Sequence, residues 1–496
     1  MEQPRSPLRY LLPRLQDILF ILVFYFVLVI GTGLFRDGDP GRHITMGLYI
    51  LRNHTIPVRD IFSYTMLGQP LTPHEWLAQL VYGAAYSLFN LNGVVLVAGI
   101  LISLSIILIY RDLLHRQTSR VVALIMALWA ASMMSIHWLA RPHLFTWVYL
   151  ALWTPLLLRL IKGKRVPLWI FPVIMLIWAN SHGAFIAGFV VWLACLGGWL
   201  FDSLLTGKVT PTPVLRNLAT VGVSSFAVTF LNPAGWRLWS TSVGYISNRY
   251  LVDLTSEYRS PNFHDPASWT FLLFVLVAII LISRSPRKIN SAETFLLVGW
   301  LMLGLISSRN IPLFAIVSTP ILSEYIQPFL MGIPFFKRIL LRVDKTDQYF
   351  RGPLWSVLGL LLLSTLVLTG HPQDAARQGY HFNEIEFPVG AVNWLELHPQ
   401  SGNMFNYFPW GGYLIYKMWP QDMVFMDGQL DFYGEKLTRE NQEVIHADPG
   451  WEKVIDEYQI RWVIVPHDSP LSQVLHILPD WNILYEDSTT LIARKQ

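Results

Sequence analysis

The sequence has few charged residues and almost no cysteine. Asp, Glu, Lys and Arg make up 14% of the 496 residues, whereas 53% are hydrophobic, and the mean hydropathy is +0.40. These values exclude an ordinary soluble protein and indicate a polytopic membrane protein. The single cysteine, Cys195, excludes an intramolecular disulfide. A net charge of +4 on so long a chain gives no reason to expect a nucleic-acid partner.

Several catalytic and binding motifs are also missing from the sequence. Gly411-Gly412 and Asp427-Gly428 are typical of tight turns, and neither belongs to a Gly-rich phosphate loop. The chain has no Gly-x-Ser-x-Gly motif for a serine hydrolase and no compact Cys/His set for zinc. It also shows no convincing internal repeat of the kind found in many transporters.

Apolar runs long enough to cross about 30 Å of hydrocarbon predict about eleven membrane spans. They lie near 15–35, 91–110, 121–139, 143–160, 167–180, 184–201, 217–232, 268–283, 292–307, 311–326 and 353–370. The first run is too long for a signal peptide and lacks a small-residue cleavage site, so we expect a retained span. Short polar breaks at 141–143, 180–183 and 308–310 predict tight turns between antiparallel helices.

The distribution of basic residues predicts the orientation. With a cytoplasmic amino terminus, twenty Lys and Arg residues fall in the inner segments and nine in the outer loops between spans. We therefore expect an integral protein of the plasma (inner) membrane whose amino terminus is cytoplasmic and whose C-terminal domain is extracytoplasmic.

Two domains are predicted. Residues 1–370 form a transmembrane domain with a large outer loop at 36–90, and residues 371–496 form an α/β domain. Strand-like runs in the second domain lie at 404–408, 423–426, 461–465 and 481–485, and helical patterns lie at 392–398, 435–446, 451–458 and 471–478. The fold class is thus an α-helical polytopic membrane protein with a C-terminal extracytoplasmic α/β domain.

The outer loop contains the residues that most strongly indicate chemistry. Asp37, Asp39, His43, Asp60, His74 and Glu75 all follow the first apolar run. Apolar residues at helical spacing predict amphipathic helices at 41–54 and 75–89, which would hold the two aspartates at the mouth of the bundle. In the alternative interpretation, Asp37 and Asp39 cap the following helix and Asp60 stabilises a turn.

The predicted topology places further polar residues on the same outer side. They are Arg141, His143, Asn180, His182, Glu257 and Arg309. Each one could be a simple interface anchor, but their gathering on one face favours a binding or catalytic site.

The pattern Asp37-Gly-Asp39-Pro-Gly-Arg-His43, followed by His74-Glu75-Trp76-Leu77, resembles the first outer loop of the GT-C membrane glycosyltransferases, in a bacterial branch. Other blocks extend the resemblance over most of the chain: Arg141-Pro142-His143, Asn180-Ser181-His182-Gly183, Asn232-Pro233-Ala234-Gly235, Glu257-Tyr258-Arg259-Ser260-Pro261 and Trp410-Gly411-Gly412-Tyr413.

The resemblance implies an enzyme that uses a sugar on a polyprenyl phosphate, with a catalytic acid in the first outer loop, here Asp39 or Asp37. It also implies inversion at the anomeric carbon by a single displacement, an unidentified glycan, lipid or protein acceptor, and a soluble domain after the last span. Two features depart from the family pattern. Gly41 and Arg42 replace the aromatic residues usual before His43, and the loop lacks adjacent paired acids.

The expected chemistry needs a base for the acceptor hydroxyl and cationic or hydrogen-bonding groups for the departing phosphate. Arg141, Arg309 and His182 suit the phosphate, since arginine offers a planar fork to its oxygens. No cofactor is certain; Asp37, Asp39 and His43 could hold a divalent cation, or simply cap a helix. A carrier or flippase for lipid-linked saccharides, or a non-catalytic scaffold that binds them, is the alternative function.

Overall fold

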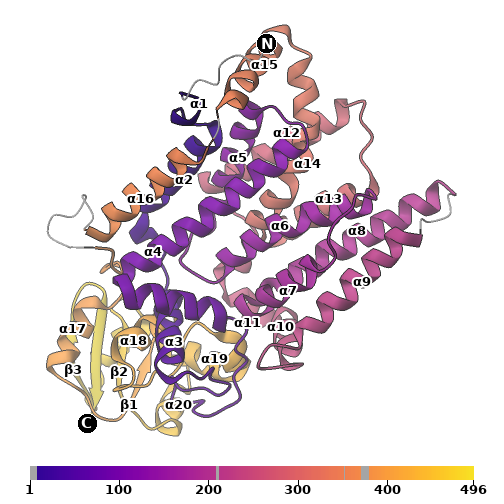
Figure 1. Cartoon of the computed structure of the whole chain (residues 1–496). Coiled ribbons are helices and arrows are strands. Elements are labelled where there is room, and N and C mark those ends of the chain that lie inside the picture. The colour runs from indigo at the N-terminus through magenta and orange to yellow at the C-terminus, as the bar shows by residue number, and fades with distance from the viewer. Residues whose placement is uncertain (1–7, 208–211, 351, 370–378) are drawn as a thin grey trace.

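The computed structural model describes residues 8–207, 212–350, 352–369 and 379–496. Long apolar helices form a bundle, and the C-terminal residues 379–496 form an α/β unit at one end of it (Figure 1). That end is named the site end, and the opposite end is named the far end. The predicted boundary between the domains, at 370–371, lies outside the described residues.

Each predicted span overlaps a helix. These helices are α2 (Leu15–Val29), α4 (Trp76–His115), α5 (Arg120–Met134), α6 (His143–Ile161), α7 (Ile170–Ser181), α8 (Ile186–Leu205), α9 (Thr212–Thr229), α12 (Trp269–Arg284), α13 (Ser291–Ile306), α14 (Ile311–Met331) and α16 (Leu354–Thr369). Large apolar side chains on the outside of the bundle, such as Leu193 and Ile279, are exposed, as expected for helices that face lipid.

Six helical segments within the described residues are long and apolar enough to cross a membrane. A seventh is added if the bent pair α15 (Pro334–Tyr349) and α16 counts as one span, and α2, α7 and α13 are shorter apolar helices. The predicted number of eleven spans therefore stays a prediction, whereas the helical bundle itself is observed.

Both predicted amphipathic helices are present at the site end. The first is α3 (Asp39–Asn53), which has a proline in its first turn and buries Ile44, Met46 and Ile50. The second is the start of α4, which is separated from the rest of that helix by non-helical backbone at Phe89 and Asn90. α3 packs closely on this segment.

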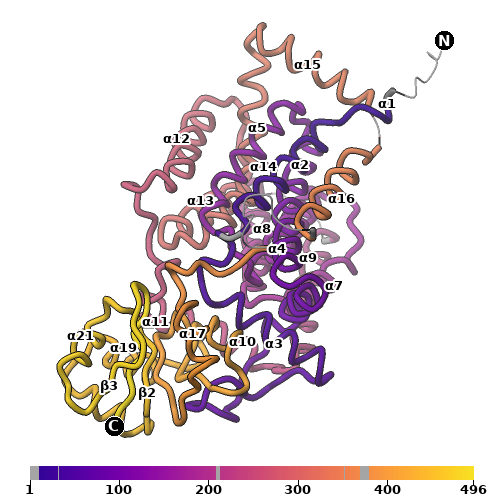
Figure 2. The backbone as a smooth tube through the Cα atoms, turned by 90° about the vertical axis from the view of Figure 1, so that its left-hand side faces the viewer, coloured from indigo at the N-terminus to yellow at the C-terminus, as the bar shows by residue number. Residues whose placement is uncertain are grey.

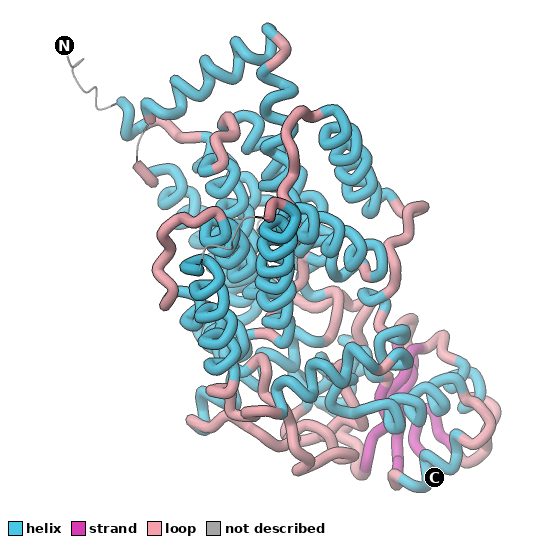
Figure 3. The backbone as a smooth tube through the Cα atoms, turned by 90° about the vertical axis from the view of Figure 1, so that its right-hand side faces the viewer, coloured by secondary structure: helices cyan, strands magenta, loops and turns pink. Residues whose placement is uncertain are grey.

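The C-terminal unit contains a mixed β-sheet, whose strands are magenta in Figure 3. The sheet has four strands in the order β1-β2-β4-β3. Its strands are β1 (Asn403–Asn406), β2 (Ile460–Pro466), β3 (Trp481–Glu486) and β4 (Thr490–Lys495), and its helices are α17 (Val389–Leu397), α18 (Gly411–Met418), α19 (Leu430–His446), α20 (Trp451–Glu457) and α21 (Pro470–Leu475). β1 runs parallel to β2, and β4 pairs antiparallel with both β2 and β3.

Three details of the C-terminal prediction are wrong. The run 423–426 is not a strand of the sheet, because Val424 instead forms an isolated bridge with Ser63. β4, at 490–495, was not predicted. Gly411-Gly412 is not a turn at a strand end but the start of α18, where the absence of side chains lets the helix approach α3: a Cβ at Gly41 would lie 2.6 Å from the carbonyl oxygen of Gly412.

The remaining helices lie at the two ends of the bundle. α10 (Arg237–Ser247) and α11 (Arg249–Leu254) are at the site end, whereas α1 (Leu8–Leu11) and α15 are at the far end (Figures 1 and 2). The segment 36–75 lies between the bundle and the C-terminal unit, and the indole N–H of Trp419 donates a hydrogen bond of 2.8 Å to the backbone oxygen of Ile61. This contact and the Ser63 bridge attach the C-terminal unit to that segment.

Candidate functional site

Arg141 lies at the centre of the site, in the turn between α5 and α6. Its Nη1 atom lies 2.9 Å from a carboxylate oxygen of Asp37, and the same guanidinium forms ion pairs with Asp39 and Glu257. Asp37 also accepts a hydrogen bond of 2.9 Å from the backbone N–H of Asp39, the first residue of α3. The two candidate bases are therefore neighbours, and one arginine binds both.

Glu257 connects Arg141 to a second arginine. One of its carboxylate oxygens lies 3.9 Å from Nε of Arg309 and 3.5 Å from Nε2 of His137. Arg309 donates a hydrogen bond of 2.7 Å to the hydroxyl of Tyr258 and stacks on that ring, with its guanidinium carbon 5.0 Å from the ring centre. Its side chain is 26% exposed, so Arg309 can still offer N–H donors to a ligand.

Glu75, directly before α4, lies among three histidines. Its carboxylate oxygens are 3.8 Å from ring nitrogens of His43, His74 and His182. Nε2 of His182 lies 3.5 Å from Nη2 of Arg309, which joins the glutamate to the arginines. Turns from three separate parts of the bundle thus meet the segment 36–75 at this point.

The C-terminal unit supplies the last part of the site. Nε of Arg42 lies 3.1 Å from a carboxylate oxygen of Asp427, and the two side chains are only 5% and 1% exposed. Arg42 also donates a hydrogen bond to Gln429. Gly428 packs against Asp39: a Cβ at position 428 would lie 2.6 Å from Oδ1 of the aspartate. The C-terminal unit therefore contacts both the base candidates and the helix that carries them.

These contacts form one group of side chains, named here the charged network. Its members are Asp37, Asp39, Arg42, His43, His74, Glu75, His137, Arg141, His182, Glu257, Arg309 and Asp427. The sequence predicted nine of these residues as site residues and did not include Arg42, His137 or Asp427.

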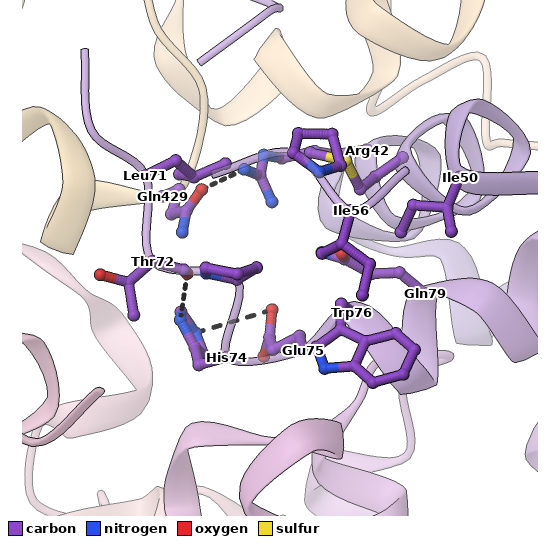
Figure 4. Close-up of a pocket in the computed structure, with 13 residues that line it drawn as sticks. Arg42, Ile50, Ile56, Leu71, Thr72, His74, Glu75, Trp76, Gln79 and Gln429 are labelled. Atoms are coloured by element: carbon purple, nitrogen blue, oxygen red, sulfur yellow. Dashed lines mark hydrogen bonds and ion pairs between the residues drawn. The ribbon is translucent and has the colours of Figure 1, made fainter. Parts of the chain in front are cut away.

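A narrow pocket lies beside the charged network, between α3 and the start of α4 (Figure 4). Its polar lining residues are Arg42, Thr72, His74, Glu75, Gln79 and Gln429, and its apolar lining residues include Met46, Ile50, Ile56, Leu71 and Trp76. In Figure 4 the Glu75 carboxylate and the Arg42 guanidinium face one another across the opening.

Burial among like charges changes the ionisation of the acids. Burial raises the pKa of Asp37 to about 7; Arg141 opposes this change, and the charges of Asp39 and Glu257 add to it. Burial also raises the pKa of Glu75, against the effect of His74 and two arginines. For Glu257, burial acts upward, but the charges of Arg141, His137 and Arg309 together outweigh it, so the pKa falls well below its usual range. A pKa of about 7 allows Asp37 to exchange a proton near neutral pH.

Three predicted site residues lie outside the charged network. Two of them, His143 and Asn180, connect the turns of the bundle. His143 is buried, and its Nε2 lies 2.9 Å from the backbone oxygen of His137. Asn180 accepts hydrogen bonds of 2.6 Å from Trp76 and 3.2 Å from Asn232. These contacts hold the turns of the bundle together behind the site.

The third, Asp60, stabilises a turn. Its carboxylate accepts hydrogen bonds from the backbone N–H groups of Phe62 and Ser63, at 3.2 and 3.0 Å, and from the Ser63 hydroxyl at 2.7 Å. The side chain is buried with these partners. The alternative interpretation of Asp60 as a turn residue agrees with this geometry, and its predicted role in substrate binding stays a prediction.

Asp37, Asp39 and His43 have different partners in this structure, and their binding of a divalent cation stays a prediction. The two aspartates are directed at Arg141, whereas Nδ1 of His43 lies 3.3 Å from the side-chain nitrogen of Gln79. In the described part of the chain, no group of three or more His, Cys, Asp or Glu side chains is arranged to hold a metal ion.

Comparison with known proteins identifies the fold. No protein-family model matches the sequence, and no curated protein matches it. The structure is similar to the archaeal oligosaccharyltransferase AglB from Archaeoglobus fulgidus in complex with an inhibitory peptide and a dolichol-phosphate, with a TM-score of 0.58, 13% identity, and coverage of 96% of this chain and 74% of that chain. The apo form of the Archaeoglobus fulgidus oligosaccharyltransferase gives a TM-score of 0.53, 13% identity, and coverage of 90% and 69%.

A third similar structure is ArnT from Cupriavidus metallidurans bound to undecaprenyl phosphate. It has a TM-score of 0.49 and 15% identity, and the match covers 96% of this chain and 97% of that chain. The likeness to the two oligosaccharyltransferase structures shows that the chain shares their fold, which is the fold that the resemblance to the GT-C membrane glycosyltransferases implies.

Proposed function

We propose that the chain is a glycosyltransferase that moves a sugar from a polyprenyl-phosphate-linked donor to an acceptor hydroxyl at the site end. The observation that carries this proposal is the binding of Asp37, Asp39 and Glu257 by Arg141 where the bundle, the segment 36–75 and the C-terminal unit meet. The similar oligosaccharyltransferase structure supports a lipid-linked donor, since it contains a dolichol-phosphate.

The proposed reaction is a single displacement. The acceptor oxygen forms a bond to the anomeric carbon while the bond from that carbon to the phosphate oxygen breaks, and the lipid phosphate leaves with the electron pair. Asp37 takes the proton of the acceptor hydroxyl, because its pKa of about 7 suits a general base near neutral pH. Arg309, which is partly exposed, stabilises the departing phosphate. Attack opposite the leaving group inverts the anomeric carbon.

The transfer assay tests this proposal. Purified protein receives polyprenyl-phosphate monosaccharides with labelled sugar and membrane lipid extract, and labelled product is measured for the wild type, Asp37→Asn and Asp39→Asn. We expect at least a 100-fold loss for Asp37→Asn. Asp456→Asn is the matched control, because Asp456 is exposed in the C-terminal unit and pairs only with Lys495 in the described residues. Donor binding without product in any variant would refute the enzyme and favour a carrier or scaffold.

We also propose that the site end faces outward from the plasma membrane, with a cytoplasmic amino terminus. The support is the excess of Lys and Arg in the segments assigned to the inner side. Labelling of single cysteines in a Cys195→Ser background tests it in intact cells. Ile385→Cys, on the highly exposed surface of the C-terminal unit, should react with an impermeant maleimide, whereas Lys164→Cys should not. The reverse pattern would contradict this orientation.

A further inference from the structure

α15 is an amphipathic helix that the proposed transfer reaction does not use. It lies at the far end of the bundle, distant from the charged network (Figures 1 and 2). Its axis makes an angle of 79° with that of α16, an apolar helix of 16 residues. The sequence predicts α16 as a membrane span, and a helix almost perpendicular to such a span runs along the membrane surface.

The acidic residues of α15 are turned toward the protein. Asp347 accepts a hydrogen bond of 2.7 Å from the backbone N–H of Leu15 and lies 2.8 Å from Nε of Arg120. Asp344 accepts a hydrogen bond of 2.7 Å from the backbone N–H of Arg120. These contacts fasten the helix to the starts of α2 and α5 and neutralise its negative charges.

The basic residues of α15 are turned away from the protein. They are Lys337, Arg338, Arg342 and Lys345, and they are named here the basic face. All four are exposed, and none has an ion pair with a residue that the structure describes. Arg338, Arg342 and Lys345 follow one another at spacings of four and three residues, so they form one stripe along the helix.

An exposed apolar stripe runs beside the basic face. Phe335 and Ile339, which are 68% and 41% exposed, are four residues apart, and Phe336 lies next to them. A helix with such a pair of stripes places its apolar side chains among acyl chains and its cations at the level of lipid phosphates. Because the four cations of the basic face have no ion-pair partner among the described residues, a ligand of this face is expected to carry negative charge.

We propose that the basic face of α15 binds the phosphate groups of anionic phospholipids in the leaflet at the far end of the bundle. This surface is separate from the charged network and does not depend on the proposed sugar transfer. Attraction of polybasic segments to anionic lipids is a local effect, so the lipids are expected directly around α15.

Lipid retention tests the proposal. The whole chain is reconstituted in vesicles of equal parts phosphatidylglycerol and phosphatidylcholine, extracted again with mild detergent, and its retained lipids are counted by mass spectrometry. We expect the wild type to retain phosphatidylglycerol about threefold or more over phosphatidylcholine. Replacement of the whole basic face by glutamine should remove this preference.

The matched control removes the same charge from other exposed positions assigned to the far end. It replaces Lys164, Arg165, Arg284 and Lys288 by glutamine, and it should keep the preference for phosphatidylglycerol. Equal retention of both lipids by the wild type, an unchanged preference without the basic face, or an equal loss in the control would overturn the proposal. Each variant is compared at equal melting temperature and elution volume, so that misfolded protein is removed from the measurement.

A second measurement tests the position of the helix even if the glutamine variant does not fold. A spin label on Ile339→Cys, in a Cys195→Ser background, is examined in the same vesicles. A membrane-immersed label collides more with oxygen than with a water-soluble nickel complex, which is the expected result. Preferential collision with the nickel complex would show that α15 lies in water, and the proposal would be wrong.

Discussion

Asp37→Asn is expected to stabilise the protein at the same time as it abolishes transfer. The folded protein holds the pKa of Asp37 near 7, compared with an ordinary value of 3.8. This rise of about three pH units corresponds to about 4 kcal/mol at 1.36 kcal/mol per unit. Because the side chain is 31% exposed, solvent screening reduces the expected effect to about 1–3 kcal/mol.

The pH dependence of the carboxyl group's protonation determines whether Asp37→Asn raises or lowers the stability. A carboxyl group whose pKa is raised by folding contributes stability while it is protonated in both states, and that contribution is lost as the pH rises from about 4 to about 7. Asparagine is neutral at every pH and still accepts the hydrogen bond from the Asp39 backbone. Arg141 keeps Asp39 and Glu257 as partners. The variant should therefore gain stability over the wild type as the pH rises through this window.

The assay is thermal unfolding of both proteins in one detergent, followed by tryptophan fluorescence at several pH values from about 4 to about 8. The difference in melting temperature should grow with pH and become constant above about pH 7. The exposed control Asp456→Asn should show no such growth over the upper half of this range. A difference for Asp37→Asn that is the same at every pH, or that shrinks toward high pH, would refute the assignment of a raised pKa and with it the choice of Asp37 as base.

Three further substitutions test the contacts around the site by thermal unfolding. Arg42→Met should lower the free energy of unfolding by about 3–5 kcal/mol, because it leaves Asp427 buried without its partner. Adding Asp427→Asn should recover part of that loss. An Arg42→Met variant as stable as the wild type would contradict the pairing. Gly412→Ala should lower both stability and transfer, because its Cβ would collide with the backbone before α3, whereas Gly299→Ala, which meets no atom within 4 Å, should change neither. Asp60→Ala should cost about 2–4 kcal/mol through three lost hydrogen bonds, and a neutral result would reject its role in the turn.

The helices could be predicted from the sequence because their signal is local. A run of apolar residues identifies a bundle helix without reference to the rest of the chain, and the 3.6-residue spacing of Ile44, Leu48 and Leu51 identifies α3 in the same way. The grouping of the site residues could be predicted from the topology. In a bundle of antiparallel helices, every second turn between helices lies at the same end. Arg141, His182 and Arg309 therefore meet although they are far apart in sequence.

Contacts between the C-terminal unit and the bundle had no such local signal. Arg42 and Asp427 are 385 residues apart, and each alone is typical of a solvated surface residue. Val424 belongs to an apolar run that is typical of a sheet strand, yet it forms an isolated bridge with Ser63, 361 residues earlier in the chain. The role of Asp60 in a turn could be predicted more easily, since Asp-x-x-Ser is a local pattern. In such a turn the carboxylate accepts hydrogen bonds from the backbone N–H groups that follow it.

The same contacts make the C-terminal unit part of the site. Asp427 neutralises Arg42 in α3, and Gly428 sets the space beside Asp39, the first residue of that helix. Arg141 reaches both aspartates only while the start of α3 stays in place, and α18 packs against that start through Gly412. The position of the two carboxylates is thus determined jointly by the bundle and by the C-terminal unit, so movement of the unit relative to the bundle would change the geometry at the proposed base.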